Sequence, residues 1–150
     1  MQISIKPEGL AKLRQRLKTA AEKLKDMRPL WSSVGMYVQR QTIKERFDKE
    51  QTPEGEKWEP LAPTTIKRKK RHKRGQMKIL HDTGELRKSI TYEAGNDHVK
   101  IGSKLKYART HQFGRGKIPA RRFLGVTEGE KEHISSMLNQ YVKRHIFGGG

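Results

Sequence analysis

The stretch SITYEAGNDHVKIG, residues 89–102, decides the fold class. Apolar and polar residues alternate over 89–94 and again over 98–102, and the turn-forming residues Gly95-Asn96-Asp97 separate the two runs. Such alternation on both sides of a short glycine-containing turn is typical of an antiparallel β-hairpin. We therefore predict a small antiparallel sheet that contains residues 89–94 and 98–102.

On the N-terminal side of this hairpin, the spacing of the apolar residues becomes helical. The pattern predicts one amphipathic helix that begins near Pro7 and a second over residues 30–47, with a break at Arg28-Pro29. Two helices joined by so short a connection can form an antiparallel pair. Their apolar positions are Leu10, Leu13, Leu17, Ala20, Ala21, Leu24 and Met27 in the first helix, and Leu30, Val34, Met36, Val38, Ile43 and Phe47 in the second.

On the C-terminal side, residues 107–113 predict a short helix that Gly114 closes. Thr127 and Glu130 have the spacing of a capping box, which opens a final amphipathic helix. The change from helical to alternating periodicity and back predicts an α+β fold with an N-terminal helical pair, a small antiparallel β-sheet and a C-terminal amphipathic helix. We expect residues 1–150 to form one domain, with a flexible tail at 148–150.

Loops occupy much of the region between the second helix and the hairpin. Residues 48–63 contain three prolines and predict an ordered loop, which the large apolar side chain of Trp58 pins to the body. Asp82 and Glu85 again have capping-box spacing and predict a short helix. We expect aromatic residues to hold the loops on the sheet and glycines to end the elements. The predicted structural anchors are Trp58, Gly84, Gly102, Tyr107, Phe113 and Phe123.

The positive charge is concentrated in two segments. The chain has 34 Lys and Arg against 16 Asp and Glu, a formal charge of +18. Residues 60–81 and 98–127 each hold eight of these cations and no acid, so they carry 16 of the 18 net charges. A nearly neutral body with two basic segments predicts an acidic protein or nucleic acid as partner, and a solvated charge run is the alternative.

The run KRKKRHKR, residues 67–74, is the denser part of this charge. Thr64 or Thr65 is placed to cap a short helix leading into it. Seven Lys and Arg side chains in eight positions repel one another, and the Debye length of about 8 Å at physiological salt screens them little. We expect a basic arm at 67–74 that is poorly ordered until an acidic partner binds it.

The sequence argues against an enzyme. It has no cysteine, no G-x-S-x-G motif and no histidine pair at i,i+4, and the Gly114–Lys117 stretch lacks phosphate-loop spacing. No apolar run approaches the roughly 20 residues of a membrane span, and the N-terminus has no signal-peptide core. We predict no catalytic residue, metal or cofactor. His111-Gln112 is the one polar pair that could act specifically, and a buried structural histidine is its other interpretation.

Several short motifs occur in a fixed order along the loops. They are Phe47, then Pro53-x-Gly55-x-x-Trp58-x-Pro60-Leu61, Ile79-Leu80-x-x-Thr83-Gly84-x-Leu86-x-x-Ser89-Ile90, Ile101-Gly102-Ser103, Tyr107-Ala108-x-x-His111-Gln112-Phe113-Gly114 and Ile118-Pro119-Ala120-Arg121-x-Phe123-Leu124-Gly125. In this order they resemble the phage virion-morphogenesis family, the tail-completion proteins of long-tailed phages and Mu-like prophages. The resemblance covers roughly residues 30–146. Arg122 departs from it, because the family often has proline there, and so does the charge density of 67–74.

The resemblance implies a non-enzymatic structural protein of the tail end or neck that is needed for head–tail joining. Its partners would be other neck and tail proteins, and it would form a ring or dock on one. It would be assembled in the host bacterial cytoplasm and end in the virion, without a membrane or cofactor.

We expect two contact regions on such a subunit. The first is an assembly surface formed by residues 111–114 and 118–125, with His111, Gln112 and Arg121 as partner-binding residues. The second is the basic arm, represented by Lys69, Lys70 and Arg71. We favour an acidic protein over non-specific DNA contact for the arm, because 67–74 contains no aromatic residue to stack on bases. A basic nucleic-acid-binding module is the alternative function. A small hydrolase has no supporting motif.

Overall fold

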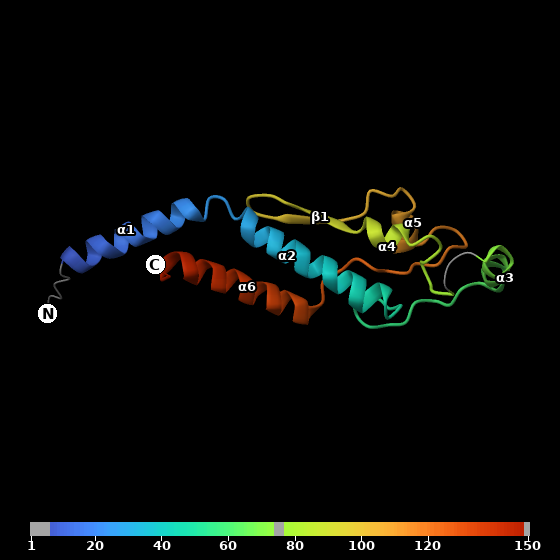
Figure 1. Ribbon diagram of the computed structural model, residues 1–150. Helices are drawn as coiled ribbons and strands as arrows, with labels where there is room; N and C mark the ends of the chain where they lie inside the picture. The colour runs from blue at the N-terminus through green and yellow to red at the C-terminus, as the bar shows by residue number, and fades with distance from the viewer. Residues whose placement is uncertain (1–6, 74–76, 149–150) are drawn as a thin grey trace.

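The computed structural model describes residues 7–73 and 77–148. Within this range, the side chains of residues 7–11 and 13 are not described. The chain is elongated, with α1 at one end and α3 at the other (Figure 1). The predicted α+β class is confirmed, because helices flank a two-stranded antiparallel sheet. The elements are α1 (Pro7–Lys23), α2 (Arg28–Gln41), the π-helix η1 (Thr42–Phe47), α3 (Pro63–His72), α4 (Glu85–Ser89), β1 (Thr91–Ala94), β2 (Val99–Gly102), α5 (Ala108–Phe113) and α6 (Glu128–Ile146).

The predicted hairpin is confirmed, although its strands are shorter than predicted. Thr91 pairs with Gly102 and Ala94 with Val99, and the turn closes with a hydrogen bond from Gly95 N to His98 O at 2.8 Å. The residues before Thr91 are excluded from the strand because α4 extends to Ser89. The short helix therefore leads almost directly into β1, which fixes the position of the hairpin relative to the loops.

The hairpin packs on one side of α2, and α6 packs on the opposite side (Figure 1). Leu30, Val34 and Val38 form the buried stripe of α2, as their spacing predicts. Gly35 permits the close approach of the hairpin, because a Cβ there would lie 2.5 Å from the Tyr92 ring and 2.9 Å from Val99 Cγ2. A glycine inside a helix costs stability by itself, so this one is explained by the packing.

The predicted antiparallel pair of the first two helices is wrong. α1 packs against α6 and runs antiparallel to its C-terminal part (Figure 1). The connection between α1 and α2 is held by the hairpin turn, since Met27 N donates to Asn96 O at 3.2 Å. The hairpin and α6 cover α2, and α1 contacts α6 beyond the end of this layer.

The second predicted helix does extend to Phe47, but its last turn is the π-helix η1. This wider turn contains Arg46, which is 1% exposed and forms a two-bonded ion pair with Glu130 of α6. The Nη1–Oε1 and Nη2–Oε2 distances are 2.6 and 2.7 Å. Because these residues are 84 positions apart, the pair ties the first half of the chain to the last helix.

Glu130 has a second role at the start of α6. The predicted capping box is confirmed, because Thr127 Oγ1 accepts a hydrogen bond from Glu130 N at 3.1 Å and Glu130 Oε2 accepts one from Thr127 N at 2.9 Å. Burial raises the pKa of the Glu130 carboxyl, but the hydrogen bonds from Arg46 and Thr127 outweigh burial and lower the pKa below its ordinary value. Glu130 is therefore a buried carboxylate at neutral pH.

The caps predicted for the two short helices do not form. α4 is preceded by Gly84 in a left-handed conformation, φ +81°, and Asp82 makes no capping hydrogen bond to Glu85. The Glu85 N–H instead donates to Thr83 Oγ1 at 3.3 Å. At α3, neither predicted threonine caps, because the helix already begins at Pro63, whose fixed φ suits a first turn.

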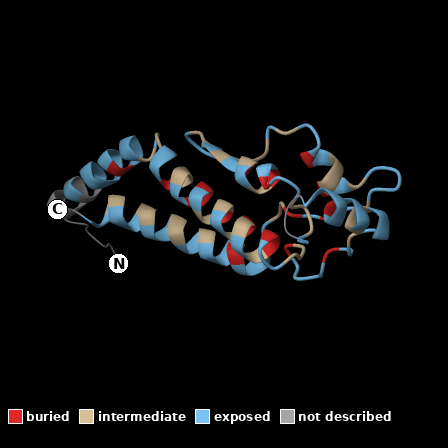
Figure 2. Ribbon diagram, turned by 45° about the vertical axis from the view of Figure 1, so that its right-hand side comes forward, coloured by how far each residue is buried: buried red, intermediate tan, exposed pale blue. Residues whose placement is uncertain are grey.

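A second core lies among the loops around α4 and α5. Buried residues follow the inner face of α2 and reappear among these loops, as Figure 2 shows. The loop core consists of Phe47, Trp58, Leu86, Ile90, Ala108 and Phe123. In the predicted C-terminal tail, Gly148 N donates to Lys143 O at 3.3 Å, and residues 149–150 lie outside the described residues. In the part of the chain that the structure describes, no helix is long and apolar enough to cross a membrane.

Candidate docking surface

The loop core positions the residues that the sequence analysis singled out. Trp58 and Phe123 are buried, as predicted. The Phe47 ring lies between them, edge-on to Trp58 at 5.6 Å between centroids and tilted against Phe123 at 5.3 Å. Trp58 Nε1 donates to Arg122 O at 2.9 Å, so the 48–63 loop is fixed to the 118–125 segment by packing and by a hydrogen bond.

Gln112 fixes the same segment from the side of α5. Its Nε2 donates to Leu124 O at 2.9 Å, and its Oε1 accepts from the backbone N–H groups of Phe123 and Leu124, both at 3.0 Å. The Gln112 side chain thus makes the hydrogen bonds that a neighbouring strand would otherwise make with the irregular backbone of Phe123 and Leu124. The Gln112 amide is buried and bonded inside the molecule, so a structural role accounts for it, and partner binding by Gln112 stays a prediction.

Arg121 is also an internal residue. Its Nε donates to Glu59 O at 2.8 Å and its Nη2 to Pro60 O at 3.0 Å. Burial lowers the pKa of the Arg121 guanidinium, and Glu59 partly offsets this. The side chain closes the 48–63 loop by bonding two of its carbonyls, and partner binding by Arg121 stays a prediction.

His111 lies between these internal residues and the surface. Its backbone O accepts from Arg121 N at 2.7 Å, so residues 111–114 and 118–125 do lie side by side. Burial, and secondarily the Arg121 charge, lowers the pKa of the His111 imidazole, which is therefore neutral at pH 7. Its Nδ1 is buried and has no hydrogen-bond partner among the described residues.

Two predicted anchors point outward instead. Phe113 is 70% exposed and Tyr107 is 43% exposed, so neither holds a loop from the inside. Phe113 is the last residue of α5, and Gly114 ends the helix with φ +75°. Partial burial raises the pKa of the Tyr107 phenol, and the carboxylates of Glu85 and Asp82 raise it further. The glycine anchors fit better, since Gly84 is buried at the start of α4 and Gly102 ends β2.

The basic run is helical up to His72, and Arg74 lies outside the described residues. The mobility of a basic arm at 67–74 stays a prediction. Lys69 ties this helix to the rest of the chain. It is 5% exposed, and its Nζ donates to His81 O at 2.6 Å and to Lys78 O at 3.0 Å. Lys69 is therefore a structural residue, whereas Lys70 and Arg71 are exposed, as partner binding requires.

A groove of about 640 Å³ lies where α3 faces the 80–86 and 117–121 segments. The groove brings together the two basic segments, residues 60–81 and 98–127, which are far apart in the sequence. Tyr107, His111 and Ile118 lie along it with the exposed cations Arg68 and Lys117. Asp82 and Glu85 also line it, so the groove has a mixed charge with an excess of cations.

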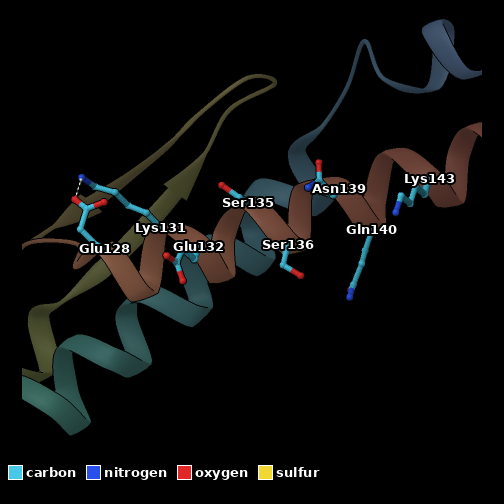
Figure 3. Close-up of a pocket in the computed structure, with 8 residues that line it drawn as sticks. All are labelled: Glu128, Lys131, Glu132, Ser135, Ser136, Asn139, Gln140 and Lys143. Atoms are coloured by element: carbon cyan, nitrogen blue, oxygen red, sulfur yellow. Dashed lines mark hydrogen bonds and ion pairs between the residues drawn. The ribbon is translucent and has the colours of Figure 1, made fainter.

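A second hollow, of about 630 Å³, runs along the outer face of α6. The side chains that line it come from this one helix and extend outward from it (Figure 3). Lys131 is already paired with Glu128 at 2.7 Å. Because one helix provides every wall, this hollow cannot enclose a ligand, and the groove at α3 is the better candidate surface. The described residues contain no group of three His, Cys, Asp or Glu side chains that could hold a metal.

Comparison with known proteins decides the family. The phage virion morphogenesis family matches residues 9–143. The chain belongs to this family. It is 37% identical over 106 residues to the Mu-like prophage FluMu G protein 1 of Haemophilus influenzae, with 69% of this chain and 71% of the relative covered. It is 30% identical over 110 residues to the putative capsid assembly protein G of Escherichia phage Mu, with 67% and 70% covered.

The predicted resemblance is therefore confirmed. FluMu G protein 2 of Haemophilus influenzae is also similar, at 38% identity over 71 residues, which cover 43% of this chain and 51% of that protein. No solved structure matches the chain. Membership of the virion morphogenesis family establishes a structural role in phage particle assembly and association with the virion.

The sequence analysis missed several residues of this family member that the structure makes important. Arg46 and Gly35 carry no local signal, because their partners lie in α6 and in the hairpin. Lys69 cannot be distinguished from the cations around it by sequence alone. The one available signal was Glu130, which the capping-box spacing identified, although not as the partner of Arg46.

Proposed function

We propose that this chain is a non-enzymatic subunit that completes the phage tail end and supports head–tail joining. The observation that carries the proposal is the family match over residues 9–143, which spans almost the entire chain. It would act in the host bacterial cytoplasm during assembly, in contact with other neck and tail proteins. It would form a ring on the particle or dock on one.

The geometry supports a docking role. The loops of the α3 end are fixed by buried side chains, which keeps exposed residues in place without a partner. Phe113, at 70%, is the most exposed of these, and Tyr107 and Ile118 in the same segments are each 43% exposed. A partner that covers them removes apolar surface from water, which is favourable. Within the predicted assembly surface, we therefore assign partner contact to the exposed Phe113 and Ile118 and to the outer edge of His111.

Deletion of the gene from an inducible prophage tests the function. We expect lysates with separate heads and tails by electron microscopy, and purified protein should restore joined particles. Joined, infectious particles at normal yield without the gene would contradict the proposal.

Phe113→Ala tests the surface, and Phe147→Ala is its matched control, since both rings are 70% exposed. We expect only Phe113→Ala to reduce the yield of joined particles, with unchanged thermal stability in both variants. Equal yields from the two variants would place the interface elsewhere.

The alternative, a free nucleic-acid-binding module, is favoured by one observation, the exposed cations of α3. A module of this kind would leave head–tail joining intact when deleted. The deletion experiment therefore separates the two functions.

A further inference from the structure

We propose that the cations of α3, together with Arg115 and Lys117 of the neighbouring turn, form one surface that binds the phosphate backbone of double-stranded DNA. This surface, called the basic face below, consists of Lys67, Arg68, Lys70, Arg71 and Lys73 with Arg115 and Lys117. The proposal does not depend on a role in head–tail joining. It concerns which polyanion this end of the molecule contacts.

The first argument is that the cations are held on a rigid element. α3 is a regular helix from Pro63 to His72, and the buried Nζ of Lys69 fixes it to the carbonyls of Lys78 and His81. Every other residue from 67 to 73 is exposed, and each is Lys, Arg or His. One lysine thus turns inward to orient the helix, and the remaining charges face solvent.

The second argument is that the basic face lacks internal counterions. Among the described residues, none of its seven cations forms an ion pair with a carboxylate. Some cations elsewhere do have a carboxylate partner, for example Arg87 with Asp48 at 3.0 Å and Arg122 with Glu54 at 3.1 Å. The unpaired charges raise the local positive potential, which an external polyanion lowers.

The third argument is convergence in space. Arg68 and Lys117 line the same groove, although they lie in different basic segments of the sequence. The 115–118 turn is closed by two hydrogen bonds of 2.9 Å between Arg115 and Ile118, with Gly116 at φ +57°, so Lys117 is displayed at a fixed position. Two rigid elements that carry cations on either side of a groove suit a continuous anionic backbone.

The composition of the basic face favours DNA over an acidic protein. This reverses the preference drawn from the lack of aromatic residues, because contacts to the phosphate backbone of a duplex need no base stacking. Protein interfaces are depleted in lysine and bury an apolar centre. The exposed side chains of α3 from 67 to 73 are lysine-rich and contain no apolar residue. Double-stranded DNA carries one negative charge per roughly 1.7 Å of its axis, a density that folded acidic proteins do not reach. Such contacts read no sequence, which fits a face made of Lys and Arg alone.

The experiment measures salt-dependent DNA binding by fluorescence anisotropy with a labelled duplex of about 30 base pairs, between about 50 and 300 mM NaCl. The test variant neutralises four cations of α3: Lys67→Gln, Arg68→Gln, Lys70→Gln and Arg71→Gln. The matched control removes the same number of Lys and Arg side chains from α1, all exposed: Lys12→Gln, Arg14→Gln, Arg16→Gln and Lys18→Gln. Circular dichroism verifies that both variants keep the wild-type helix content.

We expect the slope of log K against log salt to fall by up to about 3.6 in the α3 variant, since each lost phosphate contact removes about 0.9. The affinity at about 100 mM salt should fall at least tenfold, while the α1 variant should change by less than about threefold. Lys117→Gln alone should reduce the slope by about 0.9, because it removes one contact from the second element.

Three results would overturn the proposal. The first is no binding of wild-type protein to the duplex at about 50 mM salt. The second is an equal loss in the α1 and α3 variants, which would show a response to net charge alone. The third is displacement of the duplex by poly-glutamate at equal charge concentration, which would assign the basic face to an acidic protein. None of these results bears on the yield of joined particles, so failure here is distinguishable from failure of the proposed function.

Discussion

The two ends of the molecule are stabilised in different ways. At the helical end, Leu30, Val34 and Val38 form a simple apolar stripe between the hairpin and α6. At the loop end, Trp58 and Phe123 pack in a core whose surrounding backbone has few regular partners. There the backbone groups are bonded by buried polar side chains, notably Gln112 and Arg121.

This difference teaches a general point about residues that look functional. Helices and sheets satisfy their own backbone groups, whereas a buried loop needs side chains to do so. Gln112, Arg121 and Lys69 have the chemistry of binding residues, but their polar atoms are occupied by carbonyls and N–H groups of the same chain. The exposed Phe113, which looks like a core residue, is the better candidate for partner contact.

The largest expected effect lies at the junction of the two ends. Arg46→Met leaves the buried Glu130 carboxylate without its partner, so the free energy of unfolding should fall by about 3–5 kcal/mol in urea titrations. Arg46→Met with Glu130→Met should recover part of this loss, because no buried charge remains. Arg87→Met, which breaks an exposed pair with Asp48, is the control and should cost less than about 1 kcal/mol. Equal losses at Arg46 and Arg87 would show that the junction is unimportant.

Trp58→Ala should destabilise the loop end by about 3 kcal/mol, because it removes a buried aromatic side chain and its hydrogen bond to Arg122 O. Hydrogen exchange should show greater loss of protection in the loop region than in α2 and the hairpin. A change below roughly 0.5 kcal/mol would be incompatible with the observed packing.

Gly35→Ala probes the helical end. The new Cβ would collide with the Tyr92 ring and Val99, so the hairpin must move and unfolding should become easier by about 1–3 kcal/mol. Gly129→Ala is the matched control, since nothing lies within 4 Å of its Cβ position in α6. That substitution should be neutral or stabilising by up to about 1 kcal/mol. If Gly35→Ala and Gly129→Ala destabilise the protein equally, the effect comes from the glycine-to-alanine change itself and not from the close contact at Gly35.

The smallest effect is a pH dependence. The lowered pKa of His111 means that the unfolded chain binds its proton more readily, so this contribution to stability is complete above pH 6.5 and is lost as the pH falls. The lowered pKa of Glu130 gives a separate loss below pH 4.5, where its carboxylate becomes protonated. In His111→Asn, the midpoint of urea unfolding should therefore vary less between pH 7 and 5 than in wild type. If the unfolding midpoint changes equally with pH in wild type and in His111→Asn, His111 does not contribute to the pH dependence of stability.

Local sequence patterns predicted much of the secondary structure. The hairpin follows from alternation and a turn, the start of α6 from the spacing of Thr127 and Glu130, and the stripe of α2 from helical periodicity. The charge-rich segments and the ordered motifs of the virion morphogenesis family are also properties of the sequence alone. All of these signals lie within a few residues of one another, or in the order of motifs, and need no knowledge of which segments meet.

Only the tertiary structure decided which side chains are free. The sequence treats the Lys and Arg residues of 67–71 as equivalent, yet folding buries Lys69 beneath two carbonyls and leaves its neighbours exposed. Likewise, α1 packs on α6, and the hairpin and α6 cover α2. Burial and hydrogen bonding depend on partners that are distant in the chain, as the 84-residue separation of Arg46 and Glu130 illustrates. Residue type and local spacing do not show which distant residues will be partners, so the roles of these side chains can be assigned only from the folded structure.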